Sequence, residues 1–264
     1  QYICSNNIKN EVGAVTYTQM LNSKGGIEAD LTVTCIDKNK FRIVTGSSVR
    51  THDKKHILKY LDNSVNFIDI TDDYACLGIF GPKSRNLVSK VFGQNFSNDD
   101  FKFGTGKYIQ FNEIQMWFQR ISYVGELGWE IYIPIEKSKE IYEAIVSEEK
   151  EFKLVHAGAH SMDIMRMEKG YLHWGHDISP AENPYEANLD FATKLNKKED
   201  FVGKDYLIKE KNISRKKLVM FTINDAEPGN PLVLHDEPIF LENKIVGEST
   251  SGNYSFCYDK SMVF

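Results

Sequence analysis

The sequence predicts an α+β fold in which groups of short antiparallel strands alternate with single helices. Three strand-like segments, residues 13–21, 27–36 and 41–46, follow one another near the N-terminus and are separated by the turn-forming runs NSKGG and DKNK. Helix-like segments then stand singly between further strands. The phosphate-binding motifs G-x-G-x-x-G and G-x-x-x-x-G-K-[ST] are not found. These observations favour antiparallel sheets with packed helices over a doubly wound parallel sheet.

The first three segments predict an antiparallel meander. The elements predicted after it are helices over residues 51–63, 83–93, 137–152 and 157–170, strands over residues 66–71 and 74–82, and a long hairpin over residues 107–133. The first helix is amphipathic, because Ile57, Leu58 and Leu61 recur at helical spacing.

The last part of the chain changes character. Residues 176–190 contain two prolines and predict an irregular loop. From Lys216 onward the pattern is one of short strands only, which is typical of a small antiparallel barrel or sandwich. We therefore expect a core domain over residues 1–210, built from two interleaved α+β subdomains, and an incomplete β-barrel domain over residues 211–264 that ends without a capping turn or final strand.

The composition of the 264-residue chain argues against several classes of protein. Its net charge of −5 does not suit nucleic-acid binding, which normally requires a concentrated basic face. No apolar run approaches the roughly 18–20 residues of a membrane-spanning helix, and the first residues lack the apolar core of a signal peptide. The four cysteines lie far apart and form no C-x-x-C pair, which favours a reducing compartment such as the cytoplasm.

Asp30 is the first candidate for chemistry, because carboxylates are depleted from the interiors of strands. Alternation along residues 27–36 places it on a polar face with Glu28, Thr32 and Thr34. One interpretation is that this face is simply solvated. The other is that Asp30 meets a ligand, which the preceding double glycine would allow to approach the backbone closely.

The stretch YVGELGWEIYIP, residues 123–134, combines glycines with aromatic and acidic side chains. Glu130 and Tyr132 share one face of the predicted strand, and Trp129 lies on the other. Glu130 suits a ligand that presents a pair of hydrogen-bond donors, such as an aminopyrimidine edge. A cross-strand pair with a lysine or arginine is the alternative.

Arg166 lies among methionines in the predicted helix 157–170. An arginine there can pair with an acid three residues earlier, or bind a substrate carboxylate with its two-pronged guanidinium group. His173 and His176 have a spacing that a metal could use, but Gly175 makes a regular helix between them doubtful. We expect no metal site.

Four separated segments together resemble one known family. They are VTYTQMLNSKGGIEADLTVT, YVGELGWEIYIP, DIMRMEKGYLHWGHDISPAENPYEANLDFATKL and DFVGKDYL. In this order they are similar to the glycine-cleavage T-protein (aminomethyltransferase) family, and most of all to the folate-binding half of dimethylglycine and sarcosine dehydrogenases. The resemblance runs over nearly the whole chain. It implies a cloverleaf of domains around a folate channel, and transfer of a one-carbon unit from a small amine to tetrahydrofolate.

The resemblance also implies roles for single residues. Asp30 matches the catalytic acid that lies against the reactive nitrogens of the folate. Tyr17 matches an aromatic residue near the pteridine, and Tyr123 and Glu130 match the pair that packs on and hydrogen-bonds this ring. Arg166 matches an arginine of the family's LRLE segment and is carried over as a cofactor-binding residue.

The family's partners follow from the same resemblance. They are a small amine or iminium donor such as glycine, dimethylglycine or sarcosine, and a flavoprotein dehydrogenase or a lipoyl carrier protein. The location would be the cytoplasm, or the mitochondrial matrix in a eukaryote. Members usually carry a segment before the region that matches Gln1 and strands after the region that matches Phe264, so part of the channel wall and of the barrel is expected outside this sequence.

Two alternative functions remain. One is a folate-dependent demethylase that acts on another methylated metabolite, such as a sulfonium compound. The other is a folate-binding accessory or sensor protein without transfer activity. A cysteine-centred motif would be expected of the accessory branch and none stands out, while the presence of Asp30 favours a catalytic protein.

Overall fold

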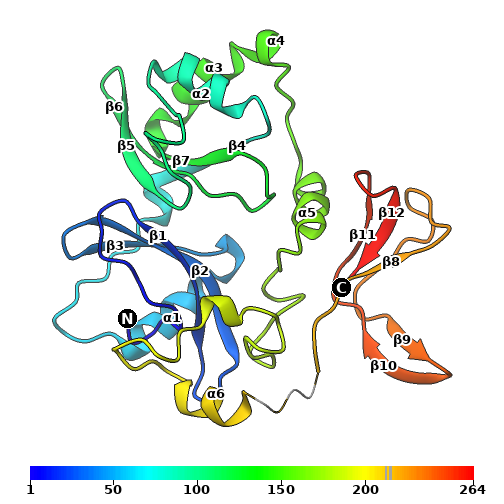
Figure 1. The fold of residues 1–264 in the computed structure, drawn as a ribbon. Helices are drawn as coiled ribbons and strands as arrows, with labels where there is room; N and C mark the ends of the chain where they lie inside the picture. Colours follow the sequence, from blue (N-terminus) through cyan, green and yellow to red (C-terminus); the bar gives the residue numbers. More distant parts are fainter. Residues whose placement is uncertain (212, 214–215) are drawn as a thin grey trace.

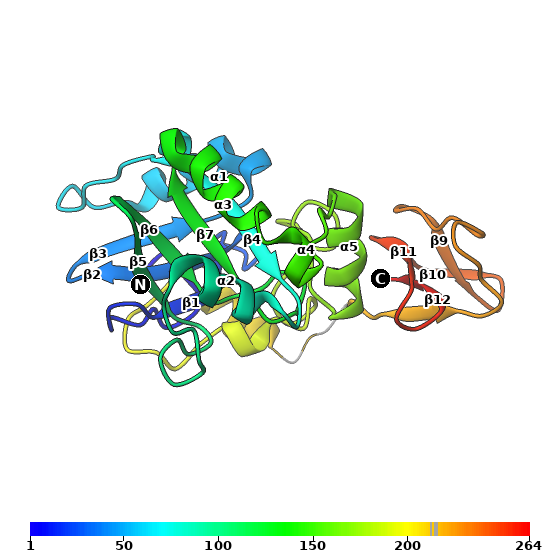
Figure 2. The ribbon, with the colours of Figure 1, turned by 90° about the horizontal axis from the view of Figure 1, so that it is seen from above.

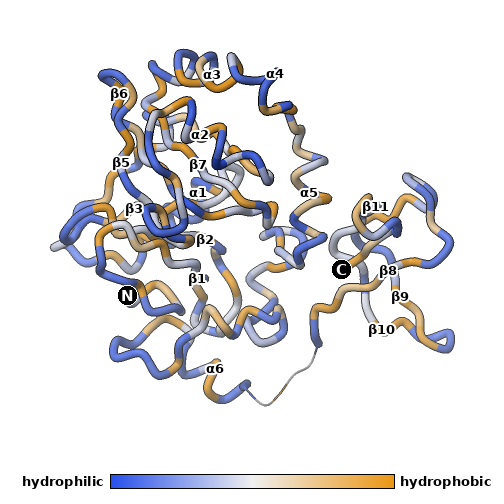
Figure 3. The backbone as a smooth tube through the Cα atoms, turned by 45° about the horizontal axis from the view of Figure 1, so that its top comes forward, coloured by the Kyte–Doolittle hydropathy of each residue, from blue (hydrophilic) through white to orange (hydrophobic). Residues whose placement is uncertain are grey.

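The computed structural model describes residues 1–211, 213 and 216–264. Its main body consists of two antiparallel sheets that form successive layers, and strands β8–β12 lie to one side of this body (Figures 1 and 2). The loops and turns between the strands are predominantly hydrophilic (Figure 3). The expected α+β class, with antiparallel sheets and packed helices, is confirmed.

The first sheet is the predicted meander. It consists of β1 (Val15–Leu21), β2 (Ile27–Asp37) and β3 (Lys40–Val44), in the order β1-β2-β3. Leu31 and Val33 point from one face of β2 into an apolar cluster that includes Ile57 of α1 (Arg50–Tyr60). The opposite face of β2 carries Asp30 and Thr34, as the alternation predicts, and it turns toward the second sheet.

The second sheet has the order β4-β7-β6-β5. Its strands are β4 (Tyr74–Phe80), β5 (Gly106–Phe111), β6 (Ile114–Gln119) and β7 (Gly128–Pro134). Trp129, Ile131 and Ile133 of β7 are fully buried in the largest apolar cluster, to which α2 (Ser84–Phe92) and α3 (Ser138–Val146) also contribute. This apolar face packs the second sheet against its helices, and the opposite face of β7 is directed toward the first sheet.

The two sheets meet through a close backbone contact and a polar layer. The Gly13 carbonyl accepts a hydrogen bond from the Gly106 N–H at 2.7 Å. Gly13 has a φ of +90°, and a Cβ atom there would lie 2.6 Å from the Gly106 oxygen, so the approach requires glycine. Deeper in the layer the Thr34 hydroxyl donates to Oε1 of Gln119 at 2.8 Å, and both side chains are fully buried. Residues on facing strands thus come into hydrogen-bond contact across the two sheets.

The remaining helices are short. They are α4 (Glu149–Phe152), α5 (Ala159–Glu168) and α6 (Lys204–Glu210), with 3-10 turns η1 (Ser47–Val49), η2 (Thr71–Asp73), η3 (Ile135–Lys137) and η4 (Asp190–Ala192). None of the helices in the described residues is long and apolar enough to cross a membrane. Residues 176–190 form the predicted irregular loop.

The C-terminal strands form two small sheets. They are β8 (Phe221–Ile223), β9 (Pro238–Leu241), β10 (Lys244–Glu248), β11 (Gly252–Ser255) and β12 (Lys260–Val263). Their orders are β11-β12-β8 and β10-β9, and the described residues show no closed barrel, so the barrel stays a prediction. The last of these strands, β12, pairs with both β11 and β8.

Three predicted elements differ from the structure. Residues 66–71 are not a strand, because Asp69 accepts hydrogen bonds from the Thr71 backbone and from Arg50, and these bend the chain. The predicted hairpin over residues 107–133 is instead the three strands β5, β6 and β7. The predicted helix over residues 137–152 is interrupted between α3 and α4.

Candidate functional site

The candidate site begins where β1 and β2 pair on their polar face. Gln19 lies directly opposite Asp30 in the register, and Tyr17 lies two residues away on the same face. Nε2 of Gln19 donates to Oδ1 of Asp30 at 2.9 Å, and the Tyr17 hydroxyl also hydrogen-bonds this carboxyl group. Asp30 is therefore enclosed by polar partners, and the interpretation that it lies on a plain solvated face does not fit.

Burial controls the charge of Asp30. It raises the pKa of the carboxyl group from 3.8 to about 6, while the hydrogen bonds from Tyr17 and Gln19 lower it. Burial also holds the pKa of the Tyr17 hydroxyl well above its ordinary value, and the charge of Asp30 adds to this effect. At neutral pH, which is not far above the pKa of Asp30, the site thus combines the ionised carboxylate of Asp30 with the neutral hydroxyl of Tyr17.

Tyr123 enters the same site from the connection between β6 and β7. Its hydroxyl donates to the Leu172 carbonyl at 2.9 Å, which fixes the direction of the ring. Burial raises the pKa of Tyr123 to about 12, and the charge of Asp30 acts in the same direction. Gly125 makes the tight turn after Tyr123: its φ is +68°, and a Cβ atom there would lie 2.3 Å from Cγ of Lys169.

Glu130 lies on the facing sheet. It sits on β7 opposite Gln119, the residue that accepts the Thr34 hydroxyl across the two sheets. The Tyr132 hydroxyl donates to Oε2 of Glu130 at 2.5 Å; burial raises the pKa of Glu130, and this hydrogen bond lowers it. The predicted alternative, a cross-strand lysine or arginine, is not found: in the part of the chain that the structure describes, no salt bridge to Glu130 is present.

Arg166 has a different environment from the other predicted residues. Nε and Nη2 contact Oδ1 of Asp163 at 2.8 Å, so the pair with the acid three residues earlier is present. Nη1 donates to Oδ2 of Asp177 at 2.6 Å and to the Tyr171 carbonyl at 3.0 Å, and Nη2 donates to the Ser251 hydroxyl at 2.7 Å. All three guanidinium nitrogens are bound within the protein, so a cofactor contact by Arg166 stays a prediction that this geometry does not favour.

Three glutamine and threonine side chains of the polar layer were not singled out from the sequence. Gln19 and Gln119 are fully buried, and each amide has one end without a hydrogen-bond partner, Oε1 in Gln19 and Nε2 in Gln119. Thr34 fixes the other end of the Gln119 amide. The alternation that places Asp30 on the polar face of β2 could have pointed to Gln19, because Tyr17 and Gln19 are two residues apart.

The predicted histidine pair lies beside a third histidine. The rings of His173 and His176 lie 4.6 Å apart, and His235 packs beside His176 at 5.5 Å between ring centres. Within the described ranges, no group of three or more histidine, cysteine, aspartate or glutamate side chains is arranged to hold a metal ion.

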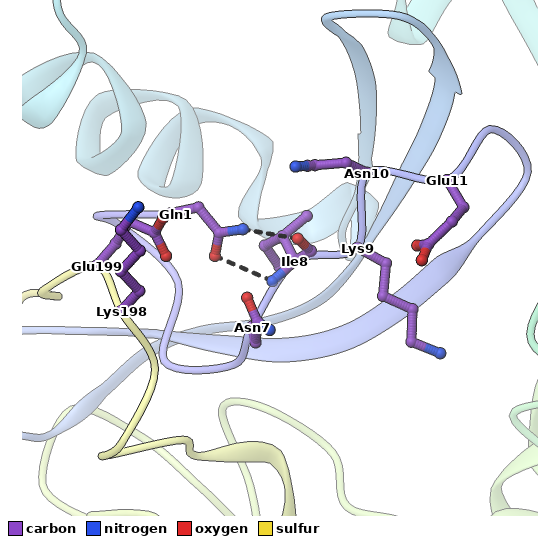
Figure 4. Close-up of a pocket in the computed structure, with 8 residues that line it drawn as sticks. All are labelled: Gln1, Asn7, Ile8, Lys9, Asn10, Glu11, Lys198 and Glu199. Atoms are coloured by element: carbon purple, nitrogen blue, oxygen red, sulfur yellow. Dashed lines mark hydrogen bonds between the residues drawn. The ribbon is translucent and has the colours of Figure 1, made fainter.

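Two surface hollows lie away from Asp30. One, of about 360 Å³, is lined by Gln1, residues 7–11, Lys198 and Glu199. Within this lining the side-chain amide of Gln1 hydrogen-bonds the backbone of Ile8 (Figure 4). The other, of about 250 Å³, lies beside the turn that carries Tyr123 and is lined by Phe103, residues 120–122 and residues 125–128. None of the predicted site residues lines either hollow.

The chain matches the model of a known protein family. The family model described as the GCVT N-terminal domain matches residues 1–197, the part of the chain that contains every predicted site residue. The chain belongs to the GCVT family. The resemblance that the four sequence segments indicate is therefore confirmed.

Individual members of the GCVT family show how far the similarity extends. Human mitochondrial dimethylglycine dehydrogenase is 36% identical over 98% of this chain, which spans only 30% of that protein. An aminomethyltransferase of Halothermothrix orenii is 32% identical over 97% of the chain and 70% of its own length. The crystal structure of the glycine cleavage system aminomethyltransferase T from Bartonella henselae superimposes with a TM-score of 0.79 over 99% of the chain and 70% of that structure, at 21% identity. This last comparison confirms the fold.

The burial of Arg166 leads to a prediction about stability. Arg166→Met leaves the fully buried Asp177 carboxylate without its cation, so the free energy of unfolding should fall by about 3–5 kcal/mol. Urea denaturation followed by circular dichroism measures this change. Lys169→Met is the matched control, because the Lys169–Glu126 pair is more exposed and should contribute less than about 1 kcal/mol. If the free energy of unfolding falls equally in the two variants, the buried Arg166–Asp177 pair does not stabilise the fold more than an exposed pair does.

The raised pKa of Asp30 leads to a prediction about pH. Because the folded state holds the proton of Asp30 up to a pKa of about 6, whereas the unfolded chain loses it near 3.8, ionisation of Asp30 destabilises the fold as pH rises through this window. Asp30→Asn should therefore be more stable than the unmodified protein by about 1–3 kcal/mol above about pH 6. The difference should disappear near about pH 3, where both side chains are neutral. Thermal unfolding across this pH range tests it, and a gap independent of pH would contradict the assignment.

Proposed function

We propose that this chain is the tetrahydrofolate-dependent part of an enzyme that moves a one-carbon unit from a small amine to tetrahydrofolate, giving methylenetetrahydrofolate. The observation that carries the proposal is the position of Asp30, a carboxylate with a raised pKa that is enclosed with Tyr17 and Tyr123. Membership of the GCVT family and similarity to aminomethyltransferase and dimethylglycine dehydrogenase support it.

The residues present suit a reduced pterin. Asp30 and Glu130 have no salt bridge to a lysine or arginine among the described residues, so both carboxylates are available to the N–H groups of a ligand. Ionised carboxylates only accept hydrogen bonds, and the aminopyrimidine edge and the ring amine of tetrahydrofolate offer donors. The ring of Tyr123 supplies a flat apolar surface, because its hydroxyl is already bound to Leu172.

Each residue then has a defined role. Glu130 binds the donor edge of the pyrimidine ring, and Tyr17 and Tyr123 pack against the pterin. Tetrahydrofolate, when bound, supplies the nucleophilic amine that captures the one-carbon unit. Asp30 would accept a hydrogen bond from that amine, stabilise its developing positive charge and take its proton. It could return this proton to the donor nitrogen as the donor C–N bond breaks, and the proton of the second folate nitrogen, which closes the methylene bridge, would pass to water.

The proposal also covers the source of the one-carbon unit and the cellular compartment of the reaction. A partner flavoprotein would supply the amine as an iminium, and a lipoyl carrier protein would supply it as an aminomethyl group. The similar proteins favour the first source, because dimethylglycine and sarcosine dehydrogenases are both among them. The cytoplasm or the mitochondrial matrix would be the location, and the relatives just named are described as mitochondrial.

The decisive experiment separates binding from transfer. Titration of tetrahydrofolate against tyrosine and tryptophan fluorescence should show saturable binding, which Asp30→Asn changes by no more than a few-fold. Formation of methylenetetrahydrofolate from an iminium generated by a sarcosine-oxidising flavoprotein should fall by about 10²–10⁴-fold in Asp30→Asn, the usual contribution of a general acid–base group. Asp37→Asn, an exposed aspartate at the end of the same strand, is the matched control and should leave both quantities unchanged.

The outcomes distinguish the candidate functions. If tetrahydrofolate does not bind, the proposal fails. If it binds and the unmodified protein transfers no one-carbon unit from any of the amines, the folate-binding accessory protein is the better description. Full transfer by Asp30→Asn would remove Asp30 from the reaction.

A further inference from the structure

We propose that Gln19 is a positioning residue that holds the carboxylate of Asp30 ionised and correctly directed for the transfer reaction. This inference rests on the proposed function, because it concerns the same carboxylate. It assigns a role to a side chain that acts through Asp30: Gln19 is fully buried, whereas Asp30, Tyr17 and Tyr123 are only partly buried.

The geometry of the β1–β2 pair carries the first step. Gln19 and Asp30 are register partners on adjacent antiparallel strands, so their side chains stand side by side on the same face. Nε2 of Gln19 lies 2.9 Å from Oδ1 of Asp30, the length of a well-formed N–H···O hydrogen bond. Because both backbones are held in a sheet, the amide restricts the rotation of the carboxyl group.

The second argument concerns Oε1, the other polar atom of the Gln19 amide. Oε1 of Gln19 is buried and has no hydrogen-bond partner in the described structure. A buried acceptor left unpaired costs about 1–3 kcal/mol, so an apolar side chain of the same shape would suit the fold at least as well. The contact with Asp30 is what the glutamine provides that an apolar side chain would not.

The third argument concerns the groups that stabilise the charge of Asp30. A donor such as Nε2 stabilises the ionised form of Asp30 and opposes the effect of burial, which raises the pKa of this group. The titratable groups that face Asp30 are Tyr17 on β1 and Tyr123 on the β6–β7 connection, and both are neutral at physiological pH. Glu28, two residues away on β2, is paired with Nε2 of His52 at 3.2 Å. No lysine or arginine joins the group in the described residues, so Gln19 and Tyr17 supply the donors that favour the carboxylate.

Gln19→Met tests the inference, because methionine keeps the length of the side chain and removes the donor. The acidic limb of the pH–rate profile for one-carbon transfer should move upward by about one pH unit, since one hydrogen bond to the ionised form is lost. The midpoint of thermal unfolding should stay the same or rise, since the unpaired Oε1 is removed as well. A merely structural role would instead lower stability and leave the limb in place.

Gln119→Met is the matched control. Gln119 is also a fully buried glutamine with one unpaired amide atom, but its Oε1 accepts from Thr34 and Trp117, and no hydrogen bond joins it to Asp30. This variant should keep the acidic limb of the unmodified protein. An equal shift in the two variants, or no shift in Gln19→Met, would overturn the inference.

A second measurement does not depend on activity. The pKa of Asp30 can be followed in the ligand-free protein by carbon NMR of the labelled carboxyl groups, with Asp30→Asn identifying the resonance. Gln19→Met should raise this pKa by about one unit. If the pKa rises while no protein, including the unmodified one, forms methylenetetrahydrofolate, the proposed function fails and the positioning role stands. If transfer proceeds normally and the pKa does not move, only the positioning role fails.

Discussion

The candidate site depends on how the polar faces of two antiparallel sheets meet, and the Thr34–Gln119 hydrogen bond is one of the contacts that join them. Each sheet buries an apolar face against its own helices, and between the sheets polar side chains meet beside a small apolar cluster of Ile36, Trp117 and Tyr132. Such a layer is stable only where its buried polar atoms find partners. The partly unpaired amides of Gln19 and Gln119 are therefore exceptions, and they occur beside the carboxylates Asp30 and Glu130.

The carboxylates of this layer are unusual in what surrounds them. Elsewhere in the chain, acids such as Asp177 and Asp69 are paired with arginine. Asp30 and Glu130 are instead bonded by neutral groups, an amide and tyrosine hydroxyls, which stabilise a negative charge without neutralising it. The site thus keeps two hydrogen-bond acceptors in a region of low dielectric constant, where their interaction with a donor is stronger than in water.

Much of this arrangement could be predicted from the sequence, because local patterns determine it. Alternation along residues 27–36 places Asp30 on the polar face, and the same rule separates Glu130 from Trp129. The strand predicted over residues 66–71 was wrong because its apolar residues matched the pattern while the hydrogen bonds of Asp69 decided the conformation. The partners of Arg166 could not be predicted beyond Asp163, since Asp177 and Ser251 are distant in the sequence. Alternation places Gln19 on the same face as Tyr17, but its pairing with Asp30 could not be predicted, because it depends on the register of the two strands.

The segment after α5 contains two adjacent carbonyl groups that face different parts of the molecule. The carbonyl of Tyr171 accepts a hydrogen bond from Arg166, which also donates to Ser251 just before β11, and the carbonyl of Leu172 accepts one from Tyr123. One short stretch of backbone therefore links a remote sheet to an aromatic ring beside Asp30. A shift of that sheet relative to the main body would act on the same peptide units that orient the ring, so the direction of the Tyr123 ring is coupled to Ser251 through Arg166 and residues 171–172.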